Sequence, residues 1–156
     1  MFITNHALAG AAIGLVLRRP VVAFAAGVAS HVAMDLCLHW GDEDLDWDGF
    51  VEVARVDGTL GLAACAAALA AAPRRARPAV AAANAGAGLI DMDKPGRHFV
   101  GRSPFPAVVD RFHRRIQNEH PIGGLVEASA VAGLAATVGA LAFRARRAAM
   151  GRGSLP

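Results

Sequence analysis

The sequence predicts an all-α integral membrane bundle of about four to five apolar helices, forming a single domain over residues 1–156. Three observations predict this fold. Apolar residues make up 54% of the chain, above the roughly 45–50% of soluble domains, and only 19% are charged. The apolar residues gather in five runs, and two polar stretches, residues 41–58 and 91–121, interrupt them. Because much of the apolar content is Ala and Gly, a soluble Ala-rich helical bundle is the alternative.

The first two apolar runs cover residues 2–17 and 21–40. No basic residue precedes the first run, which ends at Arg18, Arg19 and Pro20, the reverse of the charge order of a secretory signal peptide. The second run is about twenty residues long, enough for a hydrocarbon core of about 30 Å. It is the best single prediction of a transmembrane helix.

The third and fourth runs, residues 59–72 and 79–90, are short and rich in Ala. A segment of prolines and arginines, residues 73–78, separates them and predicts a helical hairpin with a charged turn. Runs this short require a tilted or thinned membrane environment. The fifth run, residues 122–143, is long enough to cross, and arginines follow it at Arg144, Arg146, Arg147 and Arg152.

The arginines predict which way the helices cross. If every run crosses, the clusters at residues 18–19, at residues 74–77 and after the fifth run lie on one side, which the positive-inside rule makes cytoplasmic. We therefore expect a multi-pass protein of the inner cell membrane, with both polar stretches outside and the lipid bilayer as its partner. The basic residues of 91–121 then predict an interfacial helix at the lipid headgroups. Nucleic acid is not an expected partner, because the arginines are segregated rather than interleaved with aromatic residues.

Three ionisable residues spaced four apart stand out in the second run: His31, Asp35 and His39. This spacing stacks them along one face of a helix. Charged groups within a membrane helix require partners, and imidazole and carboxylate are ordinary ligands of zinc. The stripe predicts a metal site; a polar seam that hydrogen-bonds neighbouring helices is the alternative.

The predicted topology brings further candidates to the same outer side. These are His6, Asp91, Asp93, His98, His113, His120 and Glu127. If residues 111–120 are helical, His113, Gln117 and His120 share a face and offer further ligands or a general acid and base. Glu127 lies inside the fifth apolar run, where an unpaired carboxylate is costly, and is a candidate ligand, base or partner of a ligating histidine. The convergence of all six histidines with these acids predicts one metal centre.

The acidic stretch contains Asp44, Asp46 and Asp48 followed by Gly49, the opening of a calcium-binding loop. The twelfth position, where a bidentate glutamate closes such a loop, is Arg55. A solvated acidic loop is therefore the preferred interpretation over a calcium site.

Short motifs in the N-terminal 95 residues resemble a known family. They are Asn5-His6, Ser30-His31-x-x-x-Asp35, His39-Trp40 and Asp91-x-Asp93-Lys94-Pro95. Their order resembles the membrane-bound metal-dependent hydrolases of bacteria, the YdjM-like group, and more distantly zinc-dependent phospholipase C. In that family a histidine commonly stands where this chain has Lys94. The family's later histidine-rich element is matched loosely, by His113 and residues 118–121.

The resemblance implies a hydrolase for a lipid, a phosphodiester or another membrane-associated substrate. A divalent ion, zinc for preference, is then expected on His31 and Asp35 with some of His6, His39, Asp91 and His120. Asp93 or Glu127 is expected to take a proton from water, and Arg97 or Arg114 to steady developing negative charge.

Two non-enzymatic interpretations stay open. Histidines on facing membrane helices can ligate haem iron, although the carboxylate between His31 and His39 favours a harder ion. A scaffold or transporter subunit, whose polar residues only join helices, would bind no stoichiometric metal.

Overall fold

The computed structural model describes residues 1–42 and 44–151, and this part of the chain is all-helical. Arg152, the last of the C-terminal arginines, lies outside the described residues. Seven α-helices and two short 3-10 helices follow one another over the described ranges. The predicted helical class is confirmed.

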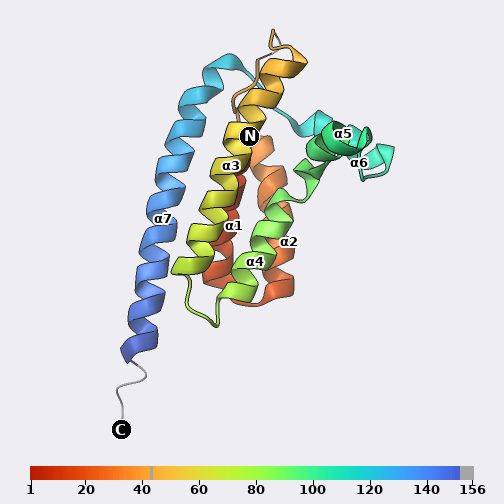
Figure 1. The fold of residues 1–156 in the computed structure, drawn as a ribbon. Coiled ribbons are helices and arrows are strands. Elements are labelled where there is room, and N and C mark those ends of the chain that lie inside the picture. The colour runs from red at the N-terminus through yellow and green to blue at the C-terminus, as the bar shows by residue number, and fades with distance from the viewer. Residues whose placement is uncertain (43, 152–156) are drawn as a thin grey trace.

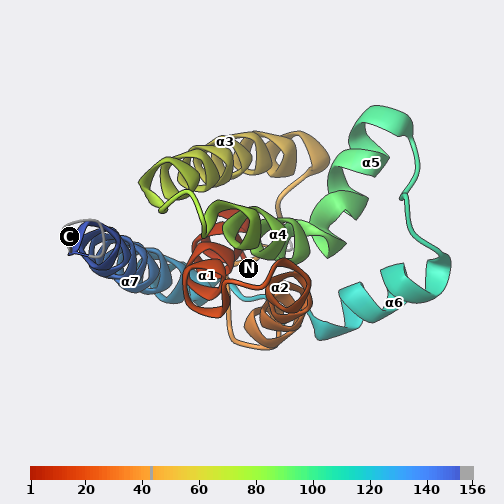
Figure 2. The ribbon, with the colours of Figure 1, turned by 90° about the horizontal axis from the view of Figure 1, so that it is seen from below.

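Four helices form an up-and-down bundle, and a fifth runs along its side. They are α1 (Ile3–Leu17), α2 (Pro20–Asp35), α3 (Trp47–Ala71), α4 (Arg77–Gly88) and α7 (Gly124–Gly151). Figure 1 shows α1 to α4 side by side with alternating direction, and Figure 2, viewed along the bundle, shows α7 on the far side of α1 from α2. The α1–α2 turn, the α3–α4 turn and the last turn of α7 lie at one end of the bundle, and the start of α1 lies at the other end.

Small residues let α4 approach both α1 and α2 closely. A methyl group at Gly14 would lie 2.6 Å from the backbone nitrogen of Val80, and one at Gly86 would lie 3.0 Å from the carbonyl carbon of Phe24. Neither position can carry a side chain without moving the backbone of its neighbour. Such small residues are typical of helices that pack backbone to backbone, as membrane helices do.

Two helix boundaries differ from the prediction. The second apolar run is helical only to Asp35, and the chain from residue 37 to 40 leaves the helix. In contrast, α3 begins at Trp47, inside the stretch predicted as a polar loop, so the loop at 41–58 is shorter than expected. The reason is a local cap: the Asp46 carboxylate accepts a hydrogen bond from the Gly49 nitrogen at 2.8 Å, which satisfies a free donor at the helix start.

The second polar stretch also contains helices. It holds η1 (Ile90–Met92), α5 (Asp93–Val100), α6 (Ala107–Ile116) and the start of η2 (Pro121–Gly123). In Figure 1, α5 and α6 project sideways from the end of the bundle at which α1 begins. As a result, α6 returns to the bundle and contacts α2.

Within residues 1–42 and 44–151, two helical segments are long and apolar enough to cross a membrane: α3 and residues Pro121–Met150. Only 11% and 17% of their apolar windows are buried inside the structure. Their outer faces expose large apolar side chains such as Leu62 and Leu125, which are 75% and 76% exposed. At 15 and 16 residues, α1 and α2 are apolar but shorter, so the best transmembrane candidate is not the second run, as the sequence predicted.

Candidate metal centre

Three histidines and three aspartates from five helical segments, α1, α2, η1, α5 and α6, meet at the end of the bundle where α1 begins. The six residues are His6, His31, Asp35, Asp91, Asp93 and His113, and none is more than 9% exposed. They form three overlapping groups of three, within each of which the potential ligand atoms all lie within 4.8 Å of one another. We call these six residues the His-Asp cluster.

Asp35 is the centre of the cluster. Its Oδ1 lies 3.1 Å from Nε2 of His6, and its Oδ2 lies 3.0 Å from Nε2 of His31 and 3.3 Å from Nε2 of His113. The Gln117 side-chain amide donates to Oδ2 at 2.8 Å and helps to fix its orientation. One carboxylate, 1% exposed, therefore faces three imidazoles that come from three different helices.

The ring of His31 is held so that its second nitrogen faces the cluster. Its Nδ1 donates a hydrogen bond to the backbone oxygen of Ala87 at 2.7 Å. That bond places a proton on Nδ1 and directs Nε2 into the cluster, 3.0 Å from Oδ2 of Asp35 and 3.4 Å from Nε2 of His113. A hydrogen bond of this kind is the usual orienting contact of a metal-bound histidine.

Asp91 of η1 and Asp93, the first residue of α5, complete the cluster. Asp91 accepts a hydrogen bond from Lys94, and Oδ1 of Asp91 lies 3.6 Å from Nε2 of His113. Asp93 Oδ2 lies 3.5 Å from Nδ1 of the same ring. His113 thus stands between three carboxylates.

The electrostatics of these residues follow from burial and mutual contact. Burial lowers the pKa of His113, but hydrogen bonds to Asp35 and Asp93 outweigh it and raise the pKa to about 9. Burial raises the pKa of Asp91, but the positive charge of Lys94 and the neighbouring imidazoles of His6 and His31 outweigh it and lower the pKa to about 2. The cluster therefore keeps carboxylates ionised and favours a cation among them.

Two buried atoms of the cluster have no hydrogen-bond partner among the described residues: Nδ1 of His6 and Oδ1 of Asp93. Buried polar atoms are almost always paired, so unpaired ones indicate a missing partner such as an ion or water. Imidazole nitrogens and carboxylate oxygens are the donors that zinc and similar divalent ions prefer. The residues present fit a divalent metal ion.

His39 was expected to share a stripe with His31 and Asp35, but α2 ends at Asp35 and the i, i+4 stacking ends with it. His39 is fully buried outside the three metal-like groups. Its Nδ1 bonds the Cys37 oxygen at 2.8 Å, and its Nε2 donates to Oε1 of Gln117 at 3.0 Å. Since Gln117 in turn donates to Asp35, Gln117 links His39 to the cluster.

Two other histidines lie outside the cluster. His98 is exposed on α5, with its ring centre 6.2 Å from that of Trp47. His120 is exposed, and its Nδ1 accepts a hydrogen bond from the Ile122 nitrogen at 3.2 Å, which caps η2. Because α6 ends at Ile116, the expected shared face of His113, Gln117 and His120 does not form. The structure therefore brings together three of the six histidines, not all of them.

Glu127 is 2% exposed, and both of its oxygens are occupied. Oε1 accepts from the Phe2 nitrogen at 3.1 Å, and Oε2 accepts from the Asn5 side-chain amide at 2.6 Å. Asp57 of α3 accepts from the next two nitrogens, those of Ile3 and Thr4. These two acids satisfy the free donors at the start of α1, so Glu127 has a structural contact where a ligand or base was expected.

The cationic side chain at the cluster is Lys94, whereas Arg97 and Arg114 were expected to provide positive charge. Arg97 pairs with Asp110 at 2.6 Å, and Arg114 is exposed on α6. The sequence signal for Lys94 was its i, i+3 spacing from Asp91, which places the two side chains on one helical face.

The acidic residues of the possible calcium loop do not belong to any of the groups of potential metal ligands found among the described residues. Asp46 caps α3 and Asp48 lies in its first helical turn. Asp44 is exposed. Because the backbone becomes helical at Trp47, the segment cannot follow the course of a calcium loop.

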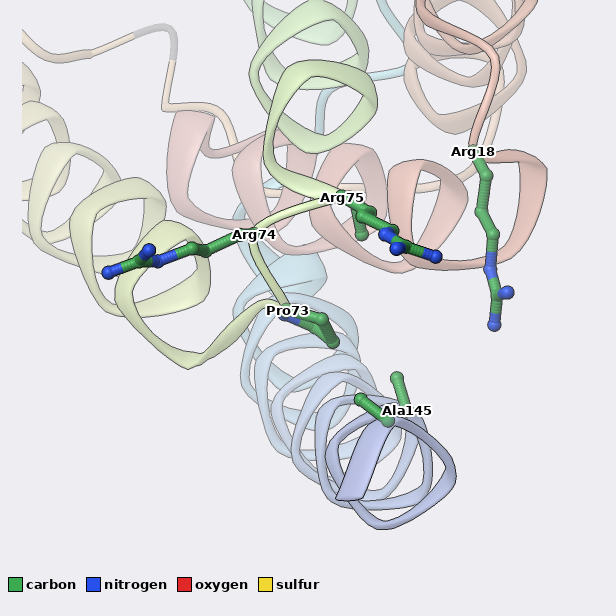
Figure 3. A pocket seen from close by; sticks show the side chains of 7 residues that line it. Arg18, Pro73, Arg74, Arg75 and Ala145 are labelled. Carbon is green, nitrogen blue, oxygen red and sulfur yellow. The ribbon is translucent and has the colours of Figure 1, made fainter. Parts of the chain in front are cut away.

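The opposite end of the bundle is basic. A pocket of about 410 Å³ lies there between the α1–α2 turn, the α3–α4 turn and α7, lined by Arg18, Arg74, Arg75, Ala145 and others. Figure 3 shows Arg18 and Arg75 extending on the same side of the α3–α4 turn while Arg74 points away. The predicted gathering of the arginine clusters at one end is confirmed for residues the structure describes.

Comparison of the chain with protein-family models, with curated proteins and with solved structures finds no match. Its function is therefore inferred from its own geometry.

Proposed function

We propose that the protein is a membrane-embedded, zinc-dependent hydrolase of a lipid, a phosphodiester or another membrane-associated substrate. The observation that carries the proposal is the His-Asp cluster, in which His6, His31 and His113 all face the buried carboxylate of Asp35. The short motifs that resemble YdjM-like hydrolases contribute His6, His31, Asp35, Asp91 and Asp93 to this same cluster.

The proposed ligands are His31, Asp35 and His113, with His6 or Asp91 beside them. The first three form one of the compact groups, and all three are buried. A zinc ion bound there supplies a Lewis acid and a water molecule of lowered pKa. His31 is already oriented for this role by the Ala87 oxygen.

Asp93 is the proposed acceptor of the proton from water. It lies against His113, and its Oδ1 has no partner among the described residues, so it can accept a proton without breaking a hydrogen bond. Lys94, whose side chain is 38% exposed, is proposed to steady negative charge on the substrate. Glu127 is not assigned a role, because both of its oxygens are engaged by α1.

The membrane assignment is supported by the outer faces of α3 and α7. A core helix of a soluble bundle would be mostly buried, whereas only 11% and 17% of the two apolar windows are buried. The basic end with Arg18, Arg74 and Arg75 is proposed to face the cytoplasm, as the positive-inside rule requires. The His-Asp cluster then lies toward the outer side of the inner membrane.

The carboxylates favour this function over haem binding. Three aspartates approach the imidazoles within 3.6 Å, and such a mixture of oxygen and nitrogen donors suits a compact divalent ion better than a porphyrin. Haem would also require room between two imidazoles, and the rings of His6 and His31 are stacked with centres 4.2 Å apart.

The function is tested by hydrolysis of bis(p-nitrophenyl) phosphate, with detergent-purified protein from which metal has been removed and to which zinc has been returned. We expect activity only with zinc, and its loss in the double variant His31→Ala with Asp35→Ala. His98→Ala is the matched control, because it removes a histidine outside the cluster. Activity that survives both metal removal and the double substitution would refute the proposal.

A further inference from the structure

A second cavity, of about 290 Å³, lies directly beside the His-Asp cluster. Its walls come from the start of α1, the segment after α2 and the first turns of α3. Most of them are apolar, including Phe2, Trp40, Leu45, Phe50, Val53 and Met92. We call this cavity the apolar pocket.

The apolar pocket is continuous with the cluster, because Asp91, Lys94 and Gln117 line it as well. Asp91 belongs to the cluster, Lys94 pairs with Asp91, and Gln117 donates to Asp35. A molecule in the pocket is therefore surrounded by apolar side chains along most of its length. One of its ends lies beside the His-Asp cluster and the ammonium group of Lys94. That distribution suits an amphiphile with an anionic head.

The other acids of the pocket each have a partner within the protein. Asp57 is engaged by the start of α1, and Asp42 accepts from the Asp44 nitrogen at 3.0 Å. Glu119 lies 3.9 Å from Nε2 of His39. Two cations line this pocket beside the cluster among the described residues: the ammonium of Lys94 and the N-terminal ammonium of Met1, which donates to Oδ1 of Asp35 at 3.0 Å.

The position and size of the pocket suit one hydrocarbon chain. Its α3 wall runs from Phe50 to Gly58, about 12 Å along the axis at 1.5 Å per residue. This is less than half of a hydrocarbon core of about 30 Å, and it lies at the end of α3 where Asp46 and Asp48 are found. The pocket can therefore hold the part of a chain nearest a lipid headgroup.

We propose that the apolar pocket binds the upper part of one acyl chain of a phospholipid, so that its phosphate group lies at Lys94 and the metal centre. This assignment of the substrate class rests on the proposed hydrolase function. In this proposal Lys94 positions the phosphate. The apolar pocket determines the specificity for lipid.

The two tryptophans provide a direct test, because Trp40 lines the pocket and Trp47 does not. In a Trp47→Phe background, Trp40 is the sole tryptophan, and the chain has no tyrosine. The probe is phosphatidylglycerol brominated in one acyl chain, added to the protein in detergent micelles. We expect saturable quenching of the Trp40 fluorescence by the bromine atoms.

Gly58→Leu adds an apolar side chain to the wall of the pocket, at a position where a Cβ meets nothing within 4 Å. Gly133→Leu is the matched control: its Cβ also meets nothing, and it lies on α7, away from the pocket. We expect Gly58→Leu to weaken lipid binding about tenfold and Gly133→Leu to leave it unchanged. Equal quenching in the two variants, or quenching that does not saturate, would overturn the proposal, because both indicate general contact with the micelle. Thermal unfolding of each variant shows that it is folded.

Zinc content measured on the same samples separates the two proposals. Retained zinc without saturable quenching overturns the acyl-chain pocket and leaves the metal centre standing. Saturable quenching that Gly58→Leu weakens, in a protein without zinc, supports the acyl-chain pocket and overturns the hydrolase.

Discussion

The two ends of the helical bundle differ in whether their charged side chains are buried and paired or exposed and unpaired among the described residues. At the end where α1 begins, three aspartates and three histidines are buried against one another. At the other end, Arg18, Arg74 and Arg75 are exposed and form no ion pair with any described residue. Nearby arginines bond backbone oxygens at helix ends instead: Arg146 donates to those of Ala70 and Ala71.

Buried charges must be compensated by other groups of the protein, whereas exposed charges can be compensated by the surroundings. An exposed arginine is stabilised by water or by lipid headgroups, and it costs the fold little. A buried carboxylate must be paired, and breaking its pairing is expensive. Substitutions at the two ends should therefore differ strongly in their effects.

The largest effect is expected from Asp35→Ala. The substitution leaves three buried imidazoles without their shared carboxylate, and loss of one partner from a buried charged network costs about 3–5 kcal/mol. Thermal unfolding in detergent measures the change. Asp44→Ala, which removes an exposed carboxylate, is the control and should leave unfolding unchanged. A similar melting temperature for both variants would contradict the account of the buried end.

The pH dependence should have opposite signs with and without zinc. The pKa of His113 is raised from 6.5 to about 9, so its protonated form adds stability to the metal-free protein below pH 6.5. That contribution is lost as the pH rises through about 9. Zinc must displace this proton, so zinc affinity should rise about tenfold per pH unit over the same interval. Competition with a chelator measures the affinity, and an affinity independent of pH would argue against His113 as a ligand.

A smaller effect is expected from Glu127→Ala. It removes the acceptor of the Phe2 nitrogen and the Asn5 amide, and buried donors left unpaired cost about 1–3 kcal/mol. Zinc content should stay at the wild-type level, because Glu127 does not contact the cluster. Glu127→Gln keeps an acceptor and should be milder. Loss of zinc in the Gln variant would indicate that Glu127 takes part in the metal centre, as its sequence position predicted.

The smallest effect is expected at the basic end. Replacing Arg18 and Arg75 with Gln removes exposed charges that have no partner among the described residues, so unfolding should change by less than about 0.5 kcal/mol. Neither zinc content nor hydrolysis should change. A stability loss comparable to that of Asp35→Ala would show that the two ends do not differ in the way described.

The sequence predicted most of the helices and the core of the candidate site. Apolar runs located α1, α4 and α7 because an apolar run of helical length needs only its own residues to be recognised. His31 and Asp35 were predicted as a pair because the i, i+4 spacing is local to one helix. The side-chain cap of Asp46 and the early end of α2 were missed, since the interior of an acidic stretch and of an apolar run carries no obvious boundary.

The rest of the site depends on contacts between distant segments. Gln117 reaches Asp35 from 82 positions away, and Glu127 reaches Asn5 from 122. No spacing rule connects such pairs. The side-by-side placement of His113 and Asp35 likewise requires the sideways excursion of α5 and α6, whereas His39 and His120 were named from a helical periodicity that the chain does not follow there.

The most direct measurement of the central claim is the zinc content of detergent-purified protein by elemental analysis. The wild type, the His98→Ala control and the double variant His31→Ala with Asp35→Ala are compared. We expect a fixed ratio of zinc to protein in the wild type and in the control. We expect no zinc in the double variant. Equal metal in all three proteins, or none in the wild type, would contradict the existence of the metal centre.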